Sequence, residues 1–293
     1  MRLRHKIKHS ILLSSIAISF VLGANIVAAR QASTKPDAGS NRPLVIAHRG
    51  GAHESTENTI GAFQRAAKIG ADGIETDIQI TSDGVVVVYH DQYFGRVEGL
   101  APAERTRLIT DMTYSELSRR ALAPVGEDKG GRRVPTLDEM LSSVKSVLLN
   151  IEMKRCARFG ELIDRTVAAL KNFPELDRVI LETPDLGTAE KLRAAFGPRL
   201  KLHINPGYDD SVPYMVSLER VLKFKPHSIS VSYKKLSREI VELAHRAGVE
   251  VWVWTVDSVD IAEAMRLLGV DAVKTDSPTM LMKLFKSKDN GRQ

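Results

Sequence analysis

The stretch GADGIETDI, residues 70–78, joins the end of a predicted helix to a short apolar strand. Gly70 is suited to end a helix because glycine readily takes the left-handed conformation found there. Three other glycines precede apolar runs in the same way: Gly197, Gly248 and Gly269. This recurring pattern predicts alternating helices and strands, the order of βα units around a parallel sheet.

The apolar, β-branched runs along the chain predict eight strands, and amphipathic stretches between them predict helices. The strands are expected at residues 44–47, 73–78, 147–152, 178–182, 200–204, 228–232, 249–254 and 272–274. The helices are expected at 59–69, 137–144, 161–172, 186–196, 212–222, 237–247 and 259–268. Eight strands with intervening helices over about 240 residues predict a (β/α)8 TIM barrel at residues 43–286, with a doubly wound open sheet as the alternative.

Residues 81–135 interrupt the repeat and predict a subdomain inserted after the second barrel strand. A turn at residues 82–84 indicates a hairpin, and residues 92–131 are expected to form loops and a short helix. Insertions after barrel strands lie over the active-site face, so this one is a candidate lid. Residues 287–293 are expected to form a disordered tail.

The N-terminus has the organisation of an export signal. Residues 1–29 contain four basic residues at the start, an apolar run from Ile11 to about Val27 and small residues at 28 and 29. An uncleaved membrane anchor is the alternative interpretation. Residues 30–42 are polar and predict a tether. We therefore expect an exported protein, periplasmic or secreted, without stable membrane insertion once the signal is removed.

The charge of the chain argues against nucleic acid as a partner. The formal net charge of +6 comes from 42 basic and 36 acidic residues, and four of the basic ones lie in the export signal. No basic stripe interleaved with aromatic residues is left outside it. The single cysteine, Cys156, excludes an internal disulfide and a cysteine-based zinc site.

Polar residues collect where the predicted strands end, which is where barrel enzymes form their active sites. These residues are His48 and Arg49 after the first strand, Glu75 and Asp77 on the second, His90 after the hairpin, and Glu152 and Lys154 at the third. Glu75 and Asp77 are two apart on a strand and share a face. With Glu152 they form an all-oxygen set suited to Ca²⁺ or Mg²⁺. Salt-bridged carboxylates without a metal are the alternative.

The two histidines and two cations suit phosphodiester cleavage. His48 and His90 could serve as general base and general acid near neutral pH. Arg49 and Lys154 could neutralise the phosphate oxygens, or they could simply neutralise Glu75 or Asp77.

In order and spacing, the motifs resemble the glycerophosphodiester phosphodiesterase family. The matching blocks are HRG at 48–50, ENT at 57–59, GADGIETD at 70–77, TSDG at 81–84, HD at 90–91, PTL at 135–137, IEMK at 151–154, VWVWTV at 251–256, GVD at 269–271 and TDSP at 275–278. They span residues 44–278, nearly all of the chain after the signal.

The resemblance implies a TIM barrel that hydrolyses small glycerophosphodiesters to sn-glycerol 3-phosphate and an alcohol. It implies a divalent cation, Ca²⁺ or Mg²⁺, held by Glu75, Asp77 and Glu152. It also implies phosphate contacts from Arg49 and Lys154, and acid/base catalysis by His48 and His90. In the family, a glycerol hydroxyl can attack first to give a cyclic phosphate, and we expect the two histidines to exchange roles when water opens it. Which histidine acts first as the base stays open.

Some segments depart from the family pattern and leave the alcohol open. Thr56 replaces the usual proline, and residues 92–96 and 181–185 differ from the usual blocks. Four further residues are candidates for the substrate pocket: Trp254, His203, Glu182 and Glu57. For Trp254, His203 and Glu182, ordinary packing or a satisfied polar edge is the alternative. Two other functions stay possible: a phospholipase D-like enzyme acting on lysophospholipids or sphingolipids, and a non-catalytic barrel that binds phosphodiesters.

Overall fold

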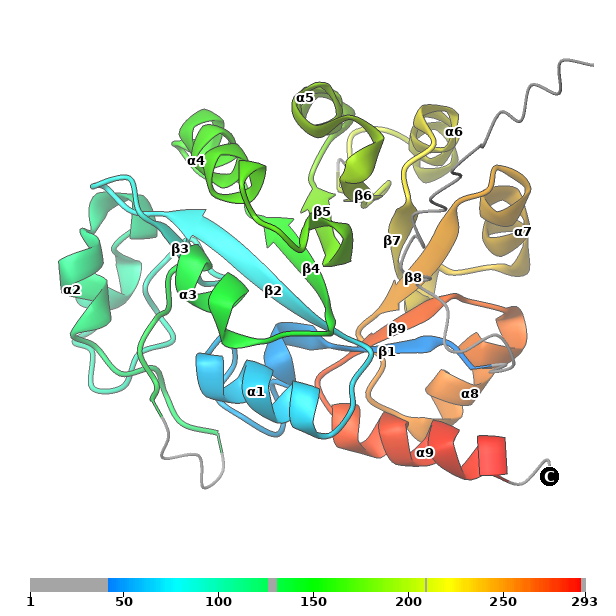
Figure 1. The fold of residues 1–293 in the computed structure, drawn as a ribbon, viewed down its shortest axis with the longest axis horizontal. Coiled ribbons are helices and arrows are strands. Elements are labelled where there is room, and N and C mark those ends of the chain that lie inside the picture. The colour runs from blue at the N-terminus through cyan, green and yellow to red at the C-terminus, as the bar shows by residue number, and fades with distance from the viewer. Residues whose placement is uncertain (1–41, 126–130, 209, 291–293) are drawn as a thin grey trace, which may run out of the picture. The chain divides into compact units, whose positions relative to one another are not determined.

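A ring of parallel strands forms the centre of the computed structural model of the chain, which describes residues 42–125, 131–208 and 210–290 (Figure 1). Around the ring the strands follow the order β1-β9-β8-β7-β6-β5-β4-β2, and β1 also pairs with β2. This second pairing closes the sheet, so the predicted barrel is confirmed and the open sheet is wrong. The strands are β1 (Leu44–Ala47), β2 (Gly73–Ile80), β4 (Leu148–Met153), β5 (Val179–Thr183), β6 (Lys201–Ile204), β7 (Ser228–Ser232), β8 (Glu250–Trp254) and β9 (Ala272–Thr275).

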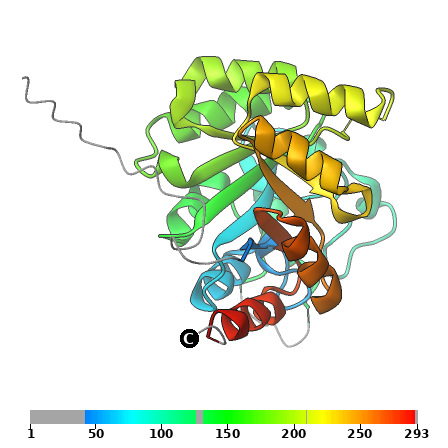
Figure 2. The same cartoon turned by 90° about the vertical axis from the view of Figure 1, so that its right-hand side faces the viewer.

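Helices lie on the outside of this ring, as the two views in Figures 1 and 2 show. They are α1 (Ile60–Lys68), α3 (Leu137–Ser143), α4 (Phe159–Lys171), α5 (Leu186–Phe196), α6 (Tyr214–Phe224), α7 (Arg238–Arg246), α8 (Val259–Leu268) and α9 (Pro278–Asn290). No helix in the described part of the chain is long and apolar enough to cross a membrane.

Every predicted strand is found within two residues of its expected ends, but the C-terminus differs from expectation. Residues 287–290, the first part of the predicted tail, belong to α9, and residues 291–293 lie outside the described residues. The helix continues because Leu281, Met282 and Phe285 are buried and no proline or glycine follows Pro278 before residue 291. The predicted export signal and nearly all of the predicted tether, residues 1–41, lie outside the described residues.

The strands are buried on both faces, as parallel barrel strands require. One apolar cluster fills the space between the sheet and the helices. A second, inside the ring, centres on Trp252, which packs with Leu44, Ile46 and Ile180. Trp252 and its neighbours therefore fill the interior of the ring with apolar side chains, and the polar residues lie toward the carboxyl ends of the strands.

The inserted segment at residues 81–135 has a small apolar core of its own. Strand β3 (Val86–Val88) pairs antiparallel with β2, which confirms the predicted hairpin. Helix α2 (Tyr114–Ser118) is the expected short helix. The core includes Tyr89, Phe94 and Leu117. Periodicity did not reveal it because the apolar residues come from irregular backbone rather than from long helices or strands.

The corner after β1 depends on left-handed backbone. Arg49, Gly50 and Gly51 have φ angles of 52°, 82° and 98°. A Cβ on Gly50 would lie 2.7 Å from Ala62 Cβ and 3.0 Å from Phe63 Cδ1. Glycine is needed here both for its conformation and for the close approach of α1.

We predict that Gly50→Ala lowers the free energy of unfolding by about 1–3 kcal/mol, because it adds backbone strain and a steric clash. Gly61→Ala is the matched control, since Gly61 lies in α1 with no atom near its missing Cβ, and we expect it to be neutral or slightly stabilising. Urea unfolding of the two variants checks this. Equal stabilities would contradict it.

Candidate active site

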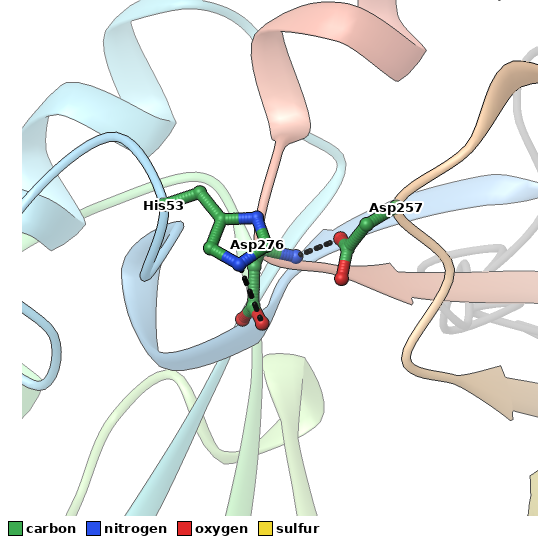
Figure 3. A group of neighbouring side chains, drawn as sticks. All are labelled: His53, Asp257 and Asp276. Atoms are coloured by element: carbon green, nitrogen blue, oxygen red, sulfur yellow. Dashed lines mark hydrogen bonds and ion pairs between the residues drawn. The ribbon is translucent and has the colours of Figure 1, made fainter.

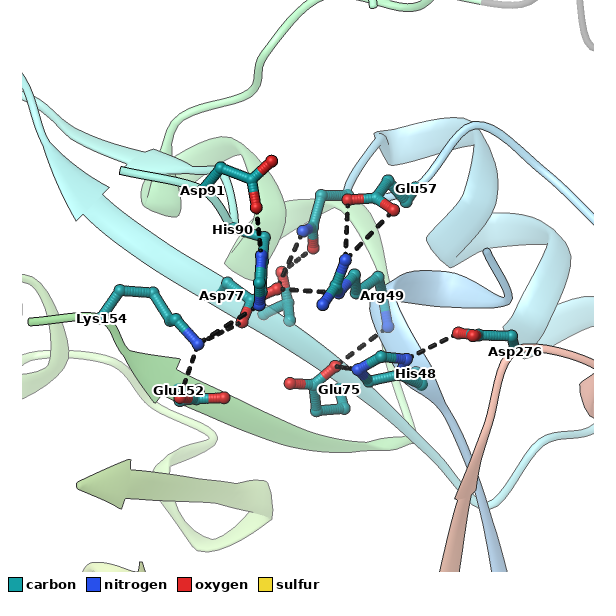
Figure 4. A network of polar contacts seen from close by, with 12 residues as sticks. His48, Arg49, Glu57, Glu75, Asp77, His90, Asp91, Glu152, Lys154 and Asp276 are labelled. Atoms are coloured by element: carbon teal, nitrogen blue, oxygen red, sulfur yellow. Dashed lines mark hydrogen bonds and ion pairs between the residues drawn. The ribbon is translucent and has the colours of Figure 1, made fainter. Parts of the chain in front are cut away.

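The polar residues at the strand ends surround one cavity of about 270 Å³ at the C-terminal end of the barrel. Its lining is His48, Arg49, Glu75, His90, Glu152, Lys154, Glu182, Asn205, Tyr208, Ser230, Trp254, Thr255 and Lys274. Figure 4 shows the polar network on the β1, β2 and β4 side. Most residues predicted for the site therefore lie together.

The ENT block after β1 organises one wall of the site. Glu57 accepts hydrogen bonds from Arg49 Nη1 at 3.2 and 3.3 Å. Asn58 Nδ2 donates to Asp77 Oδ2 at 3.0 Å, and its Oδ1 accepts from Thr76 at 2.8 Å. Thr59 caps α1. The block thus links the first helix, the Arg49 side chain and β2.

His48 is oriented by the end of the last barrel strand. Its Nδ1 lies 2.6 Å from Asp276 Oδ1, and its Nε2 lies 3.9 Å from Glu75 Oε2. Because a carboxylate only accepts, Nδ1 carries the hydrogen and Nε2 faces Glu75. Burial lowers the pKa of His48, but Glu75 and Asp276 outweigh it and raise the pKa above its usual value.

Asp276 was not among the predicted site residues, although it directly follows the last barrel strand. Its carboxylate turns to His48, while the N–H of Thr279 in the first turn of α9 donates to Glu54 Oε1 at 3.0 Å. The polar residue at a strand end was the available signal.

His90 is oriented in a similar way from the inserted segment. Its Nδ1 lies 2.6 Å from Asp91 Oδ1, and Arg96 holds the other oxygen of Asp91. Its Nε2 lies 3.4 Å from Lys154 Nζ. Burial and the charge of Lys154 lower the pKa of His90, against the opposing field of Asp77. In both histidines Nδ1 therefore bonds to an aspartate, Asp276 for His48 and Asp91 for His90.

Three carboxylates converge in the cavity, and they are not the three that were predicted. Oxygens of Glu75, Glu152 and Glu182 lie within 4.8 Å of one another. Burial raises the pKa of Glu75, and together with Glu182 it raises the pKa of Glu152 to about 7. A cation among these carboxylates would offset this cost, so the group can hold a metal ion.

Asp77 lies beside this group rather than in it. Its Oδ2 is 3.4 Å from Arg49 Nε, and its Oδ1 is 3.7 Å from Lys154 Nζ. Burial acts to raise the pKa of Asp77, but Lys154, His90 and Arg49 lower it to about 2. Oδ1 is buried without a hydrogen-bond partner among the described residues.

Arg49 and Lys154 both contact carboxylates. Lys154 Nζ lies 2.8 Å from Glu152 Oε1, and Arg49 lies between Glu57 and Asp77. In this structure Arg49 and Lys154 therefore neutralise acidic side chains, as the alternative interpretation expected. Both still line the cavity, so they also remain candidates for a phosphate.

The four pocket candidates have different positions. Trp254 and Glu182 line the cavity. His203 is fully buried, with Nδ1 2.7 Å from Ser228 Oγ and its ring centroid 5.1 Å from that of Trp252. Glu57 bonds to Arg49 and Arg96 outside the lining.

Several lining residues were missed from the sequence. Asn205 and Tyr208 follow β6, and Lys274 lies on β9. The rule that found His48 and Glu152, polar residues at the carboxyl end of a strand, applied equally to Asn205 and Lys274. Tyr208 comes from irregular backbone, where no such pattern exists.

A second group of possible metal ligands consists of His53, Asp257 and Asp276 (Figure 3). Asp257 Oδ1 accepts from Thr275 Oγ1 at 2.9 Å and from the backbone N–H of Asp276 at 2.7 Å. His53 is largely exposed. These hydrogen bonds fix the backbone at Asp276. We therefore interpret the group as a support that positions the Asp276 carboxylate.

The sequence matches the glycerophosphoryl diester phosphodiesterase family over residues 48–280. The chain belongs to this family. A curated glycerophosphodiester phosphodiesterase from Caldanaerobacter subterraneus subsp. tengcongensis is 32% identical over 249 residues, covering 84% of this chain and 98% of that protein. The lysophospholipase D GDPD1 of Homo sapiens is 29% identical over 276 residues, covering 80% of this chain and 84% of that protein.

A solved structure of an Oleispira antarctica phosphodiesterase in complex with the product sn-glycerol-3-phosphate has the same fold. It superposes with a TM-score of 0.72 at 24% identity, covering 84% of this chain and 97% of that one. Family membership makes the protein an enzyme that hydrolyses glycerophosphodiesters, which are its small-molecule substrates.

Proposed function

We propose that the enzyme releases sn-glycerol 3-phosphate and a small alcohol from water-soluble glycerophosphodiesters, using a divalent cation and two histidines. The observation that carries this proposal is the pair of imidazoles in one cavity, each with Nδ1 on a carboxylate. The product bound in the Oleispira antarctica structure supports the choice of glycerol phosphate.

The residues fit a hard divalent cation. Glu75, Asp77 and Glu152 would hold it, as their carboxylates are the ligands that Ca²⁺ and Mg²⁺ prefer. Asp77 Oδ1 is buried, has no hydrogen-bond partner among the described residues and lies 3.7 Å from Lys154 Nζ. This supports the assignment, because a buried carboxylate oxygen that accepts no hydrogen bond is free to coordinate a cation. When bound, the cation would polarise the phosphoryl group and stabilise its negative charge.

The protein's own side chains would carry the proton transfers. One histidine takes the proton of a glycerol hydroxyl as its oxygen bonds to phosphorus, and the other gives a proton to the alcohol oxygen as the P–O bond breaks. In the second step the second histidine takes a proton from water, whose oxygen opens the cyclic phosphate, and the first returns its proton to the glycerol oxygen. Arg49 and Lys154 would hold the phosphate oxygens.

Chelator should abolish release of sn-glycerol 3-phosphate from glycerophosphocholine and glycerophosphoethanolamine, and Ca²⁺ or Mg²⁺ should restore it. An enzyme-coupled glycerol 3-phosphate assay measures this on purified protein. Full activity in chelator would contradict the metal requirement.

A lipid substrate is the second candidate, favoured by the human lysophospholipase D relative and by a second cavity. This cavity, of about 360 Å³, is lined by Gln79, Gln92, Tyr93, Leu108, Thr110, Arg155, Cys156, Ala157 and Phe159. Cleavage of lysophosphatidylcholine would give choline and lysophosphatidic acid, whereas glycerophosphocholine gives choline and glycerol 3-phosphate, so an enzyme-coupled choline assay compares the two substrates. Faster choline release from lysophosphatidylcholine than from glycerophosphocholine would favour the lipid.

His48→Ala and His90→Ala should each remove turnover, while Asp276→Asn should lower kcat by roughly 10²-fold or more with little change in KM, because His48 then loses the group that orients it. His53→Ala is the control, since this exposed side chain also faces Asp276, and it should stay active. Steady-state kinetics with thermal unfolding of each variant checks this. Asp276→Asn at wild-type kcat would contradict a positioning role.

We also propose that residues 1–29 are an export signal removed in a periplasmic or secreted protein, and that 30–42 is a tether. The apolar run after four basic residues supports this. Expression in a bacterial host followed by fractionation and N-terminal sequencing should find a mature start near residue 30 outside the cytoplasm. An intact N-terminus in the membrane fraction would instead indicate an anchor.

A further inference from the structure

A buried ion pair joins two strands across the interior of the barrel. Lys274 Nζ on β9 lies 2.5 Å from Glu182 Oε2 on β5, and the two side chains are 3% and 5% exposed. Strands β6, β7 and β8 separate β5 from β9 in the ring. The pair therefore meets across the barrel lumen and not along the sheet.

Glu182 and Lys274 both line the cavity of the candidate active site. Glu182 belongs to the carboxylate group with Glu75 and Glu152. His203 Nε2, fully buried and without a hydrogen-bond partner among the described residues, lies 3.7 Å from Glu182 Oε2. Glu182 therefore has three neighbours that can stabilise its negative charge. They are the Lys274 ammonium, the His203 imidazole and a cation held by Glu75 and Glu152.

The Lys274 ammonium interacts electrostatically with the same carboxylates that would surround a metal ion. Burial acts to lower its pKa, but Glu182, Glu75 and Glu152 raise it above the usual value. A buried ammonium among carboxylates therefore offsets part of their negative charge even before a metal ion binds. Neither Glu182 nor Lys274 has a part in the acid/base pair or in the proposed phosphate contacts.

We propose that Glu182 is a fourth carboxylate ligand of the divalent cation and that Lys274 is the internal counter-ion that holds it in the barrel. The inference rests on the proposed metal dependence. Lys274 then has two effects: its ion pair holds the Glu182 carboxylate inside the barrel, and its positive charge weakens metal binding.

The deciding variant is the double substitution Glu182→Gln with Lys274→Met. It removes one negative and one positive charge, so the net charge of the cavity is unchanged and no buried charge is left without its partner. A loss of metal affinity then reports a lost ligand rather than a changed field. We expect the dissociation constants for Ca²⁺ and Mg²⁺ to rise roughly 10- to 100-fold, measured by isothermal titration calorimetry of metal-stripped full-length protein at pH 8.

Lys274→Met alone tests the counter-ion. It should bind the metal more tightly than wild type, and the metal should raise its Tm by more than it raises the wild-type Tm, because the cation then satisfies an otherwise unpaired Glu182. Asp72→Asn is the matched control: it breaks an ion pair with Arg42, 2.6 Å long, that lies before β1 and β2, away from the cavity. Its metal affinity should equal that of wild type.

A double variant that binds both metals as tightly as wild type would overturn the ligand assignment and leave the pair structural. Lys274→Met with wild-type affinity and wild-type metal-induced Tm gain would overturn the counter-ion. If wild type binds neither metal in the calorimeter, the proposed metal dependence fails as well. If wild type binds metal and loses activity in chelator while the double variant is unchanged, only the inference about Glu182 fails.

Discussion

Charged side chains at the barrel mouth are buried only because each meets an opposite charge from another part of the chain. Arg49 on the corner after β1 and Lys154 at the end of β4 both contact Asp77 on β2, and Lys274 reaches Glu182 across the lumen. A buried ion without a partner costs several kcal/mol. The partners come from strands far apart in the sequence, so the site can exist only when the ring is closed.

The same constraint explains how the two histidines are held. His48 follows the first strand but takes its carboxylate, Asp276, from the end of the last. His90 takes Asp91 from its own loop, and Arg96 of the insertion fixes that carboxylate. The glycines after β1 let α1 approach closely enough for the ENT block to reach both Arg49 and Asp77. Barrel closure, the β1 corner and the inserted segment therefore each support one part of the catalytic geometry.

Much of this could be predicted. Strand positions followed from apolar runs bounded by glycines, since a parallel strand buried on both faces leaves that pattern in the sequence. His48, Glu75, His90 and Glu152 were found because active sites of this fold gather at strand ends. The core of the insertion was missed, since contacts between irregular segments leave no period in the sequence.

By itself, the sequence determined the order of elements, the family and the set of residues near the cavity, because these depend on local pattern and spacing. The tertiary structure alone decided which residues meet: Asp276 with His48, Lys274 with Glu182, and Glu182 in place of Asp77 in the group of converging carboxylates. These pairings depend on strand register and on which side chains cross the lumen once the ring closes. Neither is encoded in the spacing of residues along one strand.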